Sequence, residues 1–340
     1  MEHKKDKTTY IAYWLKRYMS EYMITVKDMS SNTQKSYRDT FRLLLQFVGM
    51  QLRCPVDKIE MLDISESIVL SFLDEIEQKR GCTARTRNQR LAAIAGFAKY
   101  VSMHSPEYME WCRCIRNIPL KKSAIPQITY LEKDEMNAIL NAPNRSTPIG
   151  QRDYALLLFM YNTGTRADEV ASLKIRDLSE QAGKTGLSIV TIIGKGRKTR
   201  RCPLWKNTGD IIHRLIGNRG GDEPVFLNKQ KERLTRHGVY DIVTHYAKLA
   251  EEKYPSIAEK RVSPHAIRHT TATHLLQAGV DINTIRAWLG HVSINTTNIY
   301  AEVNLEMKVK ALLTCEINDC KKNRKHWRDD ESLMSFLDNI

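Results

Sequence analysis

The chain has 340 residues, of which 42% are hydrophobic and 27% charged, and these fractions exclude a largely disordered protein. It carries 53 Lys and Arg against 39 Asp and Glu, and the net charge of +14 favours a polyanionic partner such as nucleic acid. The apolar run Ala155–Tyr161 is far shorter than the ~18 residues of a membrane span, and the basic N-terminus lacks the apolar core of a secretory signal. We therefore expect a soluble cytoplasmic protein with no membrane partner.

The positive charge is divided evenly along the chain. Residues 1–125 hold 21 basic and 14 acidic side chains, and the remaining residues carry the same net charge of +7. A chain of this length can bury two separate cores, so we expect two basic domains that bind one polyanion together. The alternative is a basic pI that serves solubility alone.

The first 118 residues are predicted to form an all-helical domain. Apolar residues recur at helical spacing in three segments, which run from Thr33 to Gly49, from Ile64 to Lys79 and from Thr83 to His104. Ser31 or Asn32 is the expected N-cap of the first helix, and Gly49 is expected to stop it.

Basic residues on two of these helices are predicted to contact the phosphate backbone of double-stranded DNA. They are Lys35 and Arg38 on the first helix and Arg85, Arg87 and Arg90 on the third. A solvated helix end without a ligand is the alternative explanation for this pattern.

Residues 119–126 contain two prolines and two lysines and are predicted to link this domain to a second one, residues 127–314. Thr129 is expected to cap the first helix of the second domain. That domain is mainly helical, with one hairpin formed by a β-branched strand at 187–193, a Gly-Lys-Gly turn and a returning strand at 199–204. The predicted fold class is therefore mainly α with a small β-sheet or hairpin.

Residues 315–340 are predicted to form a charged linker and a short amphipathic helix. Leu333, Phe336, Leu337 and Ile340 share one helix face. Such a short helix does not hold itself folded in water, so its apolar face is expected to dock in a groove of a neighbouring protomer or of this chain.

Three short segments combine residues that can act on a phosphate group. In the first, an apolar helix ends at Gly164 and Arg166 opens the next helix. In the second, a Ser-Pro pair starts a helix whose first turns carry His265 and Arg268 on one face. The third, residues 288–300, reads WLGHVSINTTNIY. Each segment alone is a weak signal, because an Arg after a glycine turn is usually a surface residue and most tyrosines pack.

Together and in this order, the segments resemble the tyrosine recombinase family, which includes the phage integrases and the Xer-type enzymes. The resemblance extends over almost the whole chain and implies a SAM-like core-binding domain and a catalytic domain that form a C-shaped clamp on DNA. The family's catalytic residues fall on Arg166, Lys195, His265, Arg268, His291 and Tyr300, and its supporting acidic residue falls on Glu169. One departure is Ile267, where the family usually has leucine.

The residue types fit the cleavage of a phosphodiester. Arg166 and Arg268 can neutralise the charge that grows on the non-bridging oxygens in the transition state. Tyr300 is the expected nucleophile, and because a phenol has a pKa of about 10, it needs nearby cations to ionise.

The remaining roles follow from the resemblance. His265 is the expected general base or phosphate-orienting donor, His291 is a further donor, and Lys195 is the general acid for the departing 5′-oxygen. Around Lys195, the hairpin residues are expected to contact phosphates, with a merely solvated face as the alternative; they are Arg197, Lys198, Arg200 and Arg201.

The predicted intermediate is a covalent 3′-phosphotyrosine beside a free 5′-hydroxyl. It keeps the phosphoester energy for rejoining, so neither ATP nor a metal cofactor is expected. The seven cysteines form no paired CxxC units, so we expect no structural metal site either. The resemblance further implies a homotetramer on two DNA recombination sites, with a dimer on each, and allows accessory DNA-bending proteins.

Two alternatives share part of the pattern. A type IB topoisomerase uses the same chemistry without partner exchange, but the short N-terminal domain favours a recombinase. A DNA-binding accessory protein that has lost catalysis is disfavoured because all six catalytic residue types are present. We therefore predict a site-specific recombinase at the nucleoid, for integration and excision of a mobile element or resolution of replicon dimers.

Overall fold

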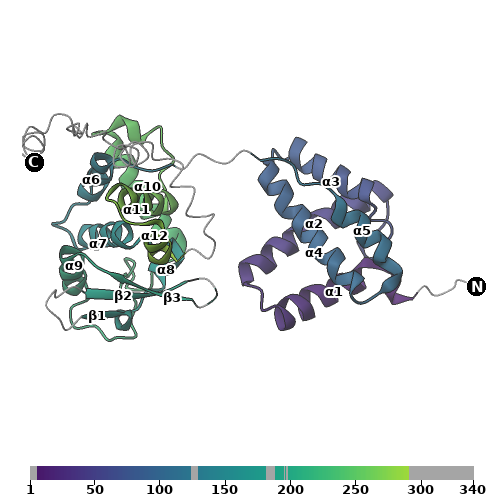
Figure 1. Ribbon diagram of the computed structural model, residues 1–340, viewed down its shortest axis with the longest axis horizontal. Coiled ribbons are helices and arrows are strands. Elements are labelled where there is room, and N and C mark those ends of the chain that lie inside the picture. The colour runs from purple at the N-terminus through teal and green to yellow at the C-terminus, as the bar shows by residue number, and fades with distance from the viewer. Residues whose placement is uncertain (1–5, 124–128, 181–187, 195, 197, 291–340) are drawn as a thin grey trace, which may run out of the picture. The chain divides into compact units, whose positions relative to one another are not determined.

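Figure 1 shows the computed structural model of the chain, which divides into two compact units, residues 1–126 and residues 127–340. The structure describes residues 6–123, 129–180, 188–194, 196 and 198–290. The division between the units falls at the end of the segment that was expected to be a linker.

The N-terminal unit is helical, and aromatic side chains fill its core. Phe41, Phe72 and Phe97, from three different helices, are each at most 2% exposed. The elements are η1 Lys7–Thr9, α1 Ile11–Arg17, the π-helix η2 Tyr18–Val26, α2 Ser31–Leu52, η3 Val56–Lys58, α3 Glu66–Gln78, α4 Ala84–Ser102, η4 Pro106–Tyr108 and α5 Met109–Asn117.

The three helices predicted in this unit are present as α2, α3 and α4, but both ends of the first were predicted wrongly. The N-cap of α2 is Ser30, one residue before the predicted positions, and its Oγ accepts a hydrogen bond from the backbone N–H of Thr33. Gly49 lies inside the helix, which ends only at Arg53 in the left-handed conformation. A glycine suits position 49 because a Cβ there would lie 3.1 Å from the carbonyl oxygen of Cys54.

The first residues of the predicted linker are bound to the N-terminal unit. The side-chain amide of Asn88 on α4 donates to the carbonyl oxygen of Lys121 at 2.8 Å and accepts from its backbone N–H at 3.1 Å. Glu77 on α3 accepts from Nζ of Lys121 at 2.5 Å, and Arg87 donates to the carbonyl oxygen of Pro119 at 3.5 Å. This part of the linker therefore belongs structurally to the unit before it.

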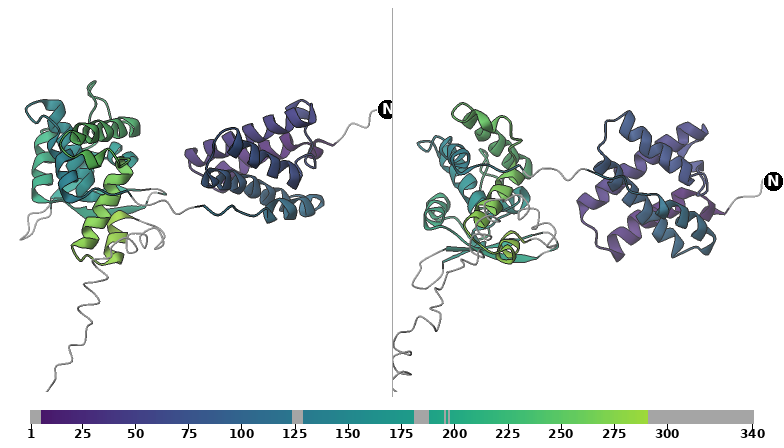
Figure 2. Two further views of the ribbon diagram at one scale, coloured as in Figure 1. Left: turned by 90° about the horizontal axis from the view of Figure 1, so that it is seen from above. Right: turned by 45° about the horizontal axis from the view of Figure 1, so that its top comes forward.

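The second unit combines helices with a small antiparallel sheet, and Figure 2 shows the strands gathered along one side of the helices. Its fold class, mainly α with a small sheet, is the predicted one. The elements are α6 Lys133–Asn141, α7 Pro148–Thr163, α8 Ala167–Ala171, η5 Ile175–Asp177, β1 Leu178–Glu180, β2 Ser188–Ile193, β3 Thr199–Pro203, α9 Lys206–Ile216, α10 Arg236–Glu251, η7 Pro255–Ile257, α11 Pro264–Gln277 and α12 Ile282–Leu289.

The predicted hairpin is confirmed as β2 and β3, an antiparallel pair in which Val190 lies opposite Cys202. Strand β1 was not predicted, because three residues are too few to show an alternating pattern; it pairs with β2 and gives the order β1-β2-β3. The cap expected at Thr129 is also wrong. Helix α6 is capped by Glu132, in a capping box with Glu135.

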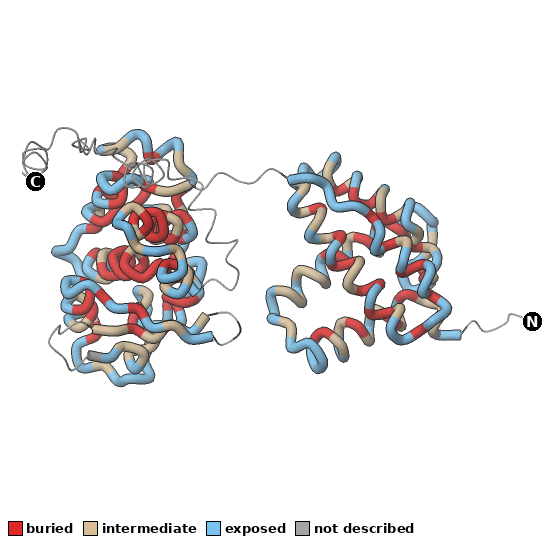
Figure 3. The backbone as a smooth tube through the Cα atoms, viewed as in Figure 1, coloured by how far each residue is buried: buried red, intermediate tan, exposed pale blue. Residues whose placement is uncertain are grey.

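Helices α7 and α11 form the centre of the second unit, and Figure 3 shows both largely buried. They pack against each other, and α12 packs against α11 and β3. The burial of α7 on several sides explains the apolar run 155–161, since a helix enclosed by its neighbours needs no polar face. In the described ranges, no helix is long and apolar enough to cross a membrane.

Candidate active site

The turn after α7 places Arg166. Gly164 closes α7 in the left-handed conformation, with φ of 60°, and a Cβ on it would lie 2.5 Å from Cδ2 of Leu289. Glycine is therefore required twice, for its backbone conformation and for the close approach of α12. Two residues later, Arg166 is the N-cap residue of the short helix α8.

Glu169 holds both the backbone and the side chain of Arg166. One carboxylate oxygen accepts from the backbone N–H of Arg166 at 3.0 Å, and the other accepts from its Nη1 at 2.7 Å. Arg200 on β3 donates to the same carboxylate at 2.7 Å. Burial alone would raise the pKa of Glu169, but the hydrogen bonds and positive charges of Arg200 and Arg166 outweigh it and lower that pKa to about 2.

Arg268 lies one turn into α11 and is only 3% exposed. Its Nη1 donates to the carbonyl oxygen of Gly164 at 2.6 Å, and its Nη2 donates to that of Leu289 at 2.7 Å. These carbonyls stand at the C-terminal ends of α7 and α12, where the helix dipoles favour a positive charge. Arg268 thus ties together the two turns that lead to Arg166 and to His291.

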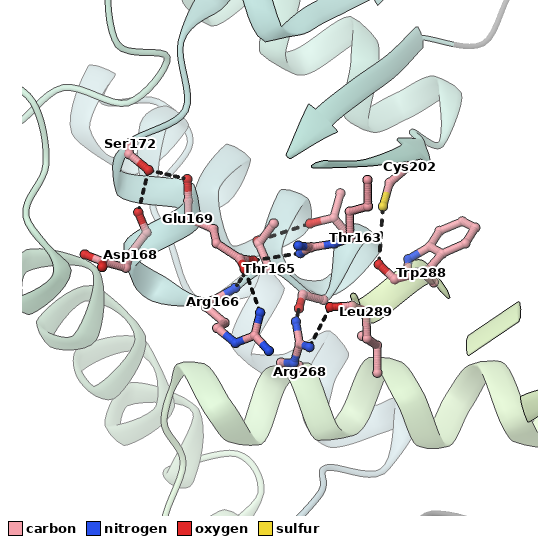
Figure 4. A network of polar contacts seen from close by, with 12 residues as sticks. Thr163, Thr165, Arg166, Asp168, Glu169, Ser172, Cys202, Arg268, Trp288 and Leu289 are labelled. Atoms are coloured by element: carbon pink, nitrogen blue, oxygen red, sulfur yellow. Dashed lines mark hydrogen bonds and ion pairs between the residues drawn. The ribbon is translucent and has the colours of Figure 1, made fainter. Parts of the chain in front are cut away.

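His265, at the start of α11, completes the described part of the site. Desolvation of its ring and the positive charges of Arg268, Arg166 and Arg236 lower its pKa, so the imidazole is neutral at pH 7 and can accept a proton. Figure 4 shows the side chains of Arg166 and Arg268 converging between α8 and α11. The structure therefore brings two predicted phosphate ligands and one predicted base to one place.

Four of the predicted site residues, Lys195, Arg197, His291 and Tyr300, lie outside the described residues. Gly194, which precedes Lys195, and Gly290, which precedes His291, are described at the ends of β2 and α12. In the described part of the chain, no three His, Cys, Asp or Glu side chains gather in a group that could hold a metal ion.

The residues predicted to contact DNA phosphates fall into two classes. In the first class the side chains are exposed or half-buried; these residues are Lys35, Arg38, Arg85, Arg90, Lys198 and Arg201. Arg38 also pairs with Asp39. Arg87 and Arg200 are different, because both side chains are turned into the protein.

Arg87 is 3% exposed, and its Nε lies 3.5 Å from a carboxylate oxygen of Glu77. The Arg200 side chain is 8% exposed and is bound to Glu169. We therefore revise both predictions, because each guanidinium is buried and its charge is already paired with a carboxylate of the protein. Strand alternation could have indicated this for Arg200, because it shares a strand face with the buried Cys202.

Comparison with known proteins identifies the family of the chain. Residues 129–307 match the model of the phage integrase family, which is more than half of the chain. The chain belongs to the phage integrase family. One relative of this integrase-family protein is y4rC of Sinorhizobium fredii, which is named as an integrase/recombinase. It is 37% identical over 331 residues, and the alignment covers 97% of this chain and 96% of the relative.

Two further similarities are to Xer recombinases. The tyrosine recombinase XerD of Listeria innocua is 30% identical to this integrase-family protein over 292 residues, covering 83% of this chain and 91% of XerD. A similar fold is found in the crystal structure of the XerH site-specific recombinase bound to palindromic difH substrate, a post-cleavage complex. The TM-score is 0.64 at 21% identity, and the match covers 84% of this chain and 80% of XerH.

These similarities confirm the predicted class of enzyme. The integrase-family protein is a tyrosine-type site-specific recombinase whose partner is DNA. They do not favour a type IB topoisomerase or a catalytically silent accessory protein.

Proposed function

We propose that Arg166, His265 and Arg268 bind and activate the scissile phosphate of a DNA recombination site. The observation that carries this proposal is the convergence of two anchored guanidinium groups; together with desolvation of the ring, their charges also lower the pKa of the His265 imidazole. Preorganised donors stabilise a developing charge strongly because they do not need to reorient during the reaction. Here Glu169 fixes Arg166, and the carbonyls of Gly164 and Leu289 fix Arg268.

Tyr300 supplies the nucleophile in this proposal. Its phenolic oxygen bonds to phosphorus, the bond from phosphorus to the 5′-oxygen breaks, and the products are a 3′-phosphotyrosine and a 5′-hydroxyl. The neutral His265 takes the phenolic proton, Lys195 gives a proton to the leaving oxygen, and His291 donates a hydrogen bond to the phosphate. The reverse steps on a partner strand rejoin the DNA, and this chemistry calls for no ATP or metal.

The assembly is proposed from the family alone. The protein would act in the cytoplasm, at the nucleoid, as a tetramer on two sites with a dimer on each, assisted in some systems by accessory DNA-bending proteins. The apolar positions Leu333, Phe336, Leu337 and Ile340 support a role for the C-terminal segment in contacts between protomers. Deleting residues 332–340 should then impair synapsis more than binding to a single site; unchanged recombination would contradict this role.

A covalent trapping experiment tests the catalytic assignment. The protein is incubated with fragmented genomic DNA and denatured, and the DNA that remains attached is sequenced to recover the site. A nicked suicide duplex containing that site should then give a stable adduct with the wild-type protein. The recovered sequence also distinguishes an end of a mobile element from a site for resolution of replicon dimers.

Two substitutions give the decisive comparison. Tyr300→Phe should abolish the adduct and leave the DNA affinity nearly unchanged, whereas the control Tyr240→Phe, at an exposed tyrosine on α10, should behave as wild type. An adduct that survives Tyr300→Phe would refute the assignment of the nucleophile.

A further inference from the structure

Arg200 lies inside the second unit, bound to the carboxylate that holds Arg166. Its Nη2 donates to Oε2 of Glu169 at 2.7 Å, and the two side chains are 8% and 5% exposed. Because Arg166 uses the other oxygen of the same carboxylate, Glu169 joins one arginine from α8 to one from β3.

Two glycines enclose this ion pair. A Cβ on Gly194, at the end of β2, would lie 3.3 Å from Oε1 of Glu169 and 3.7 Å from Nη1 of Arg200. A Cβ on Gly290, at the end of α12, would lie 3.1 Å from Cδ of Arg200 and 3.3 Å from its Nη1. In the sequence, Gly194 directly precedes Lys195 and Gly290 directly precedes His291.

We propose that Arg200 is a positioning residue for strand cleavage. By binding Glu169 between Gly194 and Gly290, it holds together the three chain segments that lead to Arg166, Lys195 and His291. This inference rests on the proposed function, because it concerns the assembly of those catalytic groups.

Two simpler roles explain the geometry less well. A phosphate contact does not suit a guanidinium that is more than nine-tenths buried and already paired with a carboxylate, whereas the buried Arg268 donates to neutral carbonyls. A purely stabilising role would be served as well by apolar packing, since a buried ion pair adds little net stability. Moreover, Nε of Arg200 is buried without a hydrogen-bond partner in the described residues, which is costly for packing alone.

The test compares Arg200→Gln with Arg201→Gln, at the next and exposed residue of the same strand. The probe is the nicked duplex containing the site recovered by trapping. The readouts are the DNA dissociation constant, the rate of adduct formation at saturating DNA, and the melting temperature. Arg200→Gln should slow adduct formation on the order of 100-fold, as expected when reacting groups are misplaced, and change the dissociation constant less than 3-fold.

Arg201→Gln should show the opposite pattern, with weaker and more salt-sensitive binding and a near-normal saturated rate, because an exposed arginine can only contact DNA from outside. Arg200→Lys keeps a charge for Glu169 and should recover part of the rate. If Arg200→Gln unfolds the protein, the double variant Glu169→Gln/Arg200→Lys provides a second test. Its rate of adduct formation should fall by less than the product of the two single-variant decreases, because the two residues act through one contact.

The proposal fails if Arg200→Gln cleaves at the wild-type rate at saturating DNA, or if Arg200→Leu cleaves as well as Arg200→Lys. A failure of the proposed function has a different signature, namely an adduct that persists in Tyr300→Phe. The two failures can therefore be told apart with one substrate.

Discussion

Nη1 of Arg268 donates to the carbonyl oxygen of Gly164 at 2.6 Å, across 104 positions of sequence. The contact joins the N-terminal part of α11 to the turn that leads to Arg166. The Gly164 carbonyl holds Arg268, and the same turn precedes Arg166 by two residues, so a disturbance of the turn should affect both arginines.

Gly164→Ala should disturb that turn severely. The new methyl group would meet Leu289 at 2.5 Å and would have to adopt a φ of 60°, so we expect a loss of about 2–4 kcal/mol in the free energy of unfolding. Urea denaturation measures this loss. The matched control is Gly279→Ala, because Gly279 also has a positive φ but a Cβ there meets nothing within 4 Å. A loss no larger than that of the control would contradict the steric explanation.

Glu169 should make stability depend on pH in the acid range. Its pKa is about 2 in the folded protein and about 4.5 in an unfolded chain, so its stabilising contribution is present above pH 4.5 and is lost as the pH falls towards 2. That difference corresponds to about 3 kcal/mol at most. The free energies of unfolding of wild type and Glu169→Gln should therefore converge as the pH falls from 4.5 to 2. A constant gap between them would rule out this linkage.

Protonation of His265 should cause the decrease of the cleavage rate at low pH, the acid limb of the pH–rate profile. The pKa of His265 lies below the ordinary value of 6.5, so the rate of adduct formation should stay level near pH 7 and fall only when the pH drops below 6.5. Removing a nearby charge in Arg236→Gln should raise this pKa and move the limb to higher pH. NMR titration of the imidazole gives the pKa directly, and an unmoved limb in Arg236→Gln would argue against His265 as the base.

Asn88→Ala should release the start of the linker. The substitution removes both hydrogen bonds to Lys121 and should cost about 1 kcal/mol locally. Trypsin should then cut after Lys121 or Lys122 several-fold faster than in wild type. Gln51→Ala, at an exposed residue of α2, serves as the control and should leave the digestion unchanged. Equal digestion of Asn88→Ala and wild type would mean that Asn88 does not hold the segment.

The elements with a strong local pattern were predictable from sequence. The amphipathic helices, the hairpin and the Ser-Pro start of α11 follow from periodicity and capping, which depend on neighbouring residues. Strand β1 and the Glu132 cap were missed because a three-residue strand and an acidic cap give weak signals.

The site was predictable in its residue types but not in their contacts. The order of the motifs indicated Arg166, His265 and Arg268, whereas the burial of Arg87 and Arg200 depends on partners from other helices and strands. The basic residue type alone does not distinguish a charge that faces DNA from one that faces a buried carboxylate; only for Arg200 does strand alternation add a local signal.

The close packing of Gly290 on Arg200 has a consequence for the evolution of this family. A Cβ at position 290 would lie 3.1 Å from Cδ and 3.3 Å from Nη1 of Arg200, so a side chain there would require Arg200 to shift. Homologues that carry a larger residue at position 290 are therefore expected to carry a shorter one at position 200, so that the two positions co-vary. An alignment in which they vary independently would show that the contact is not under joint selection.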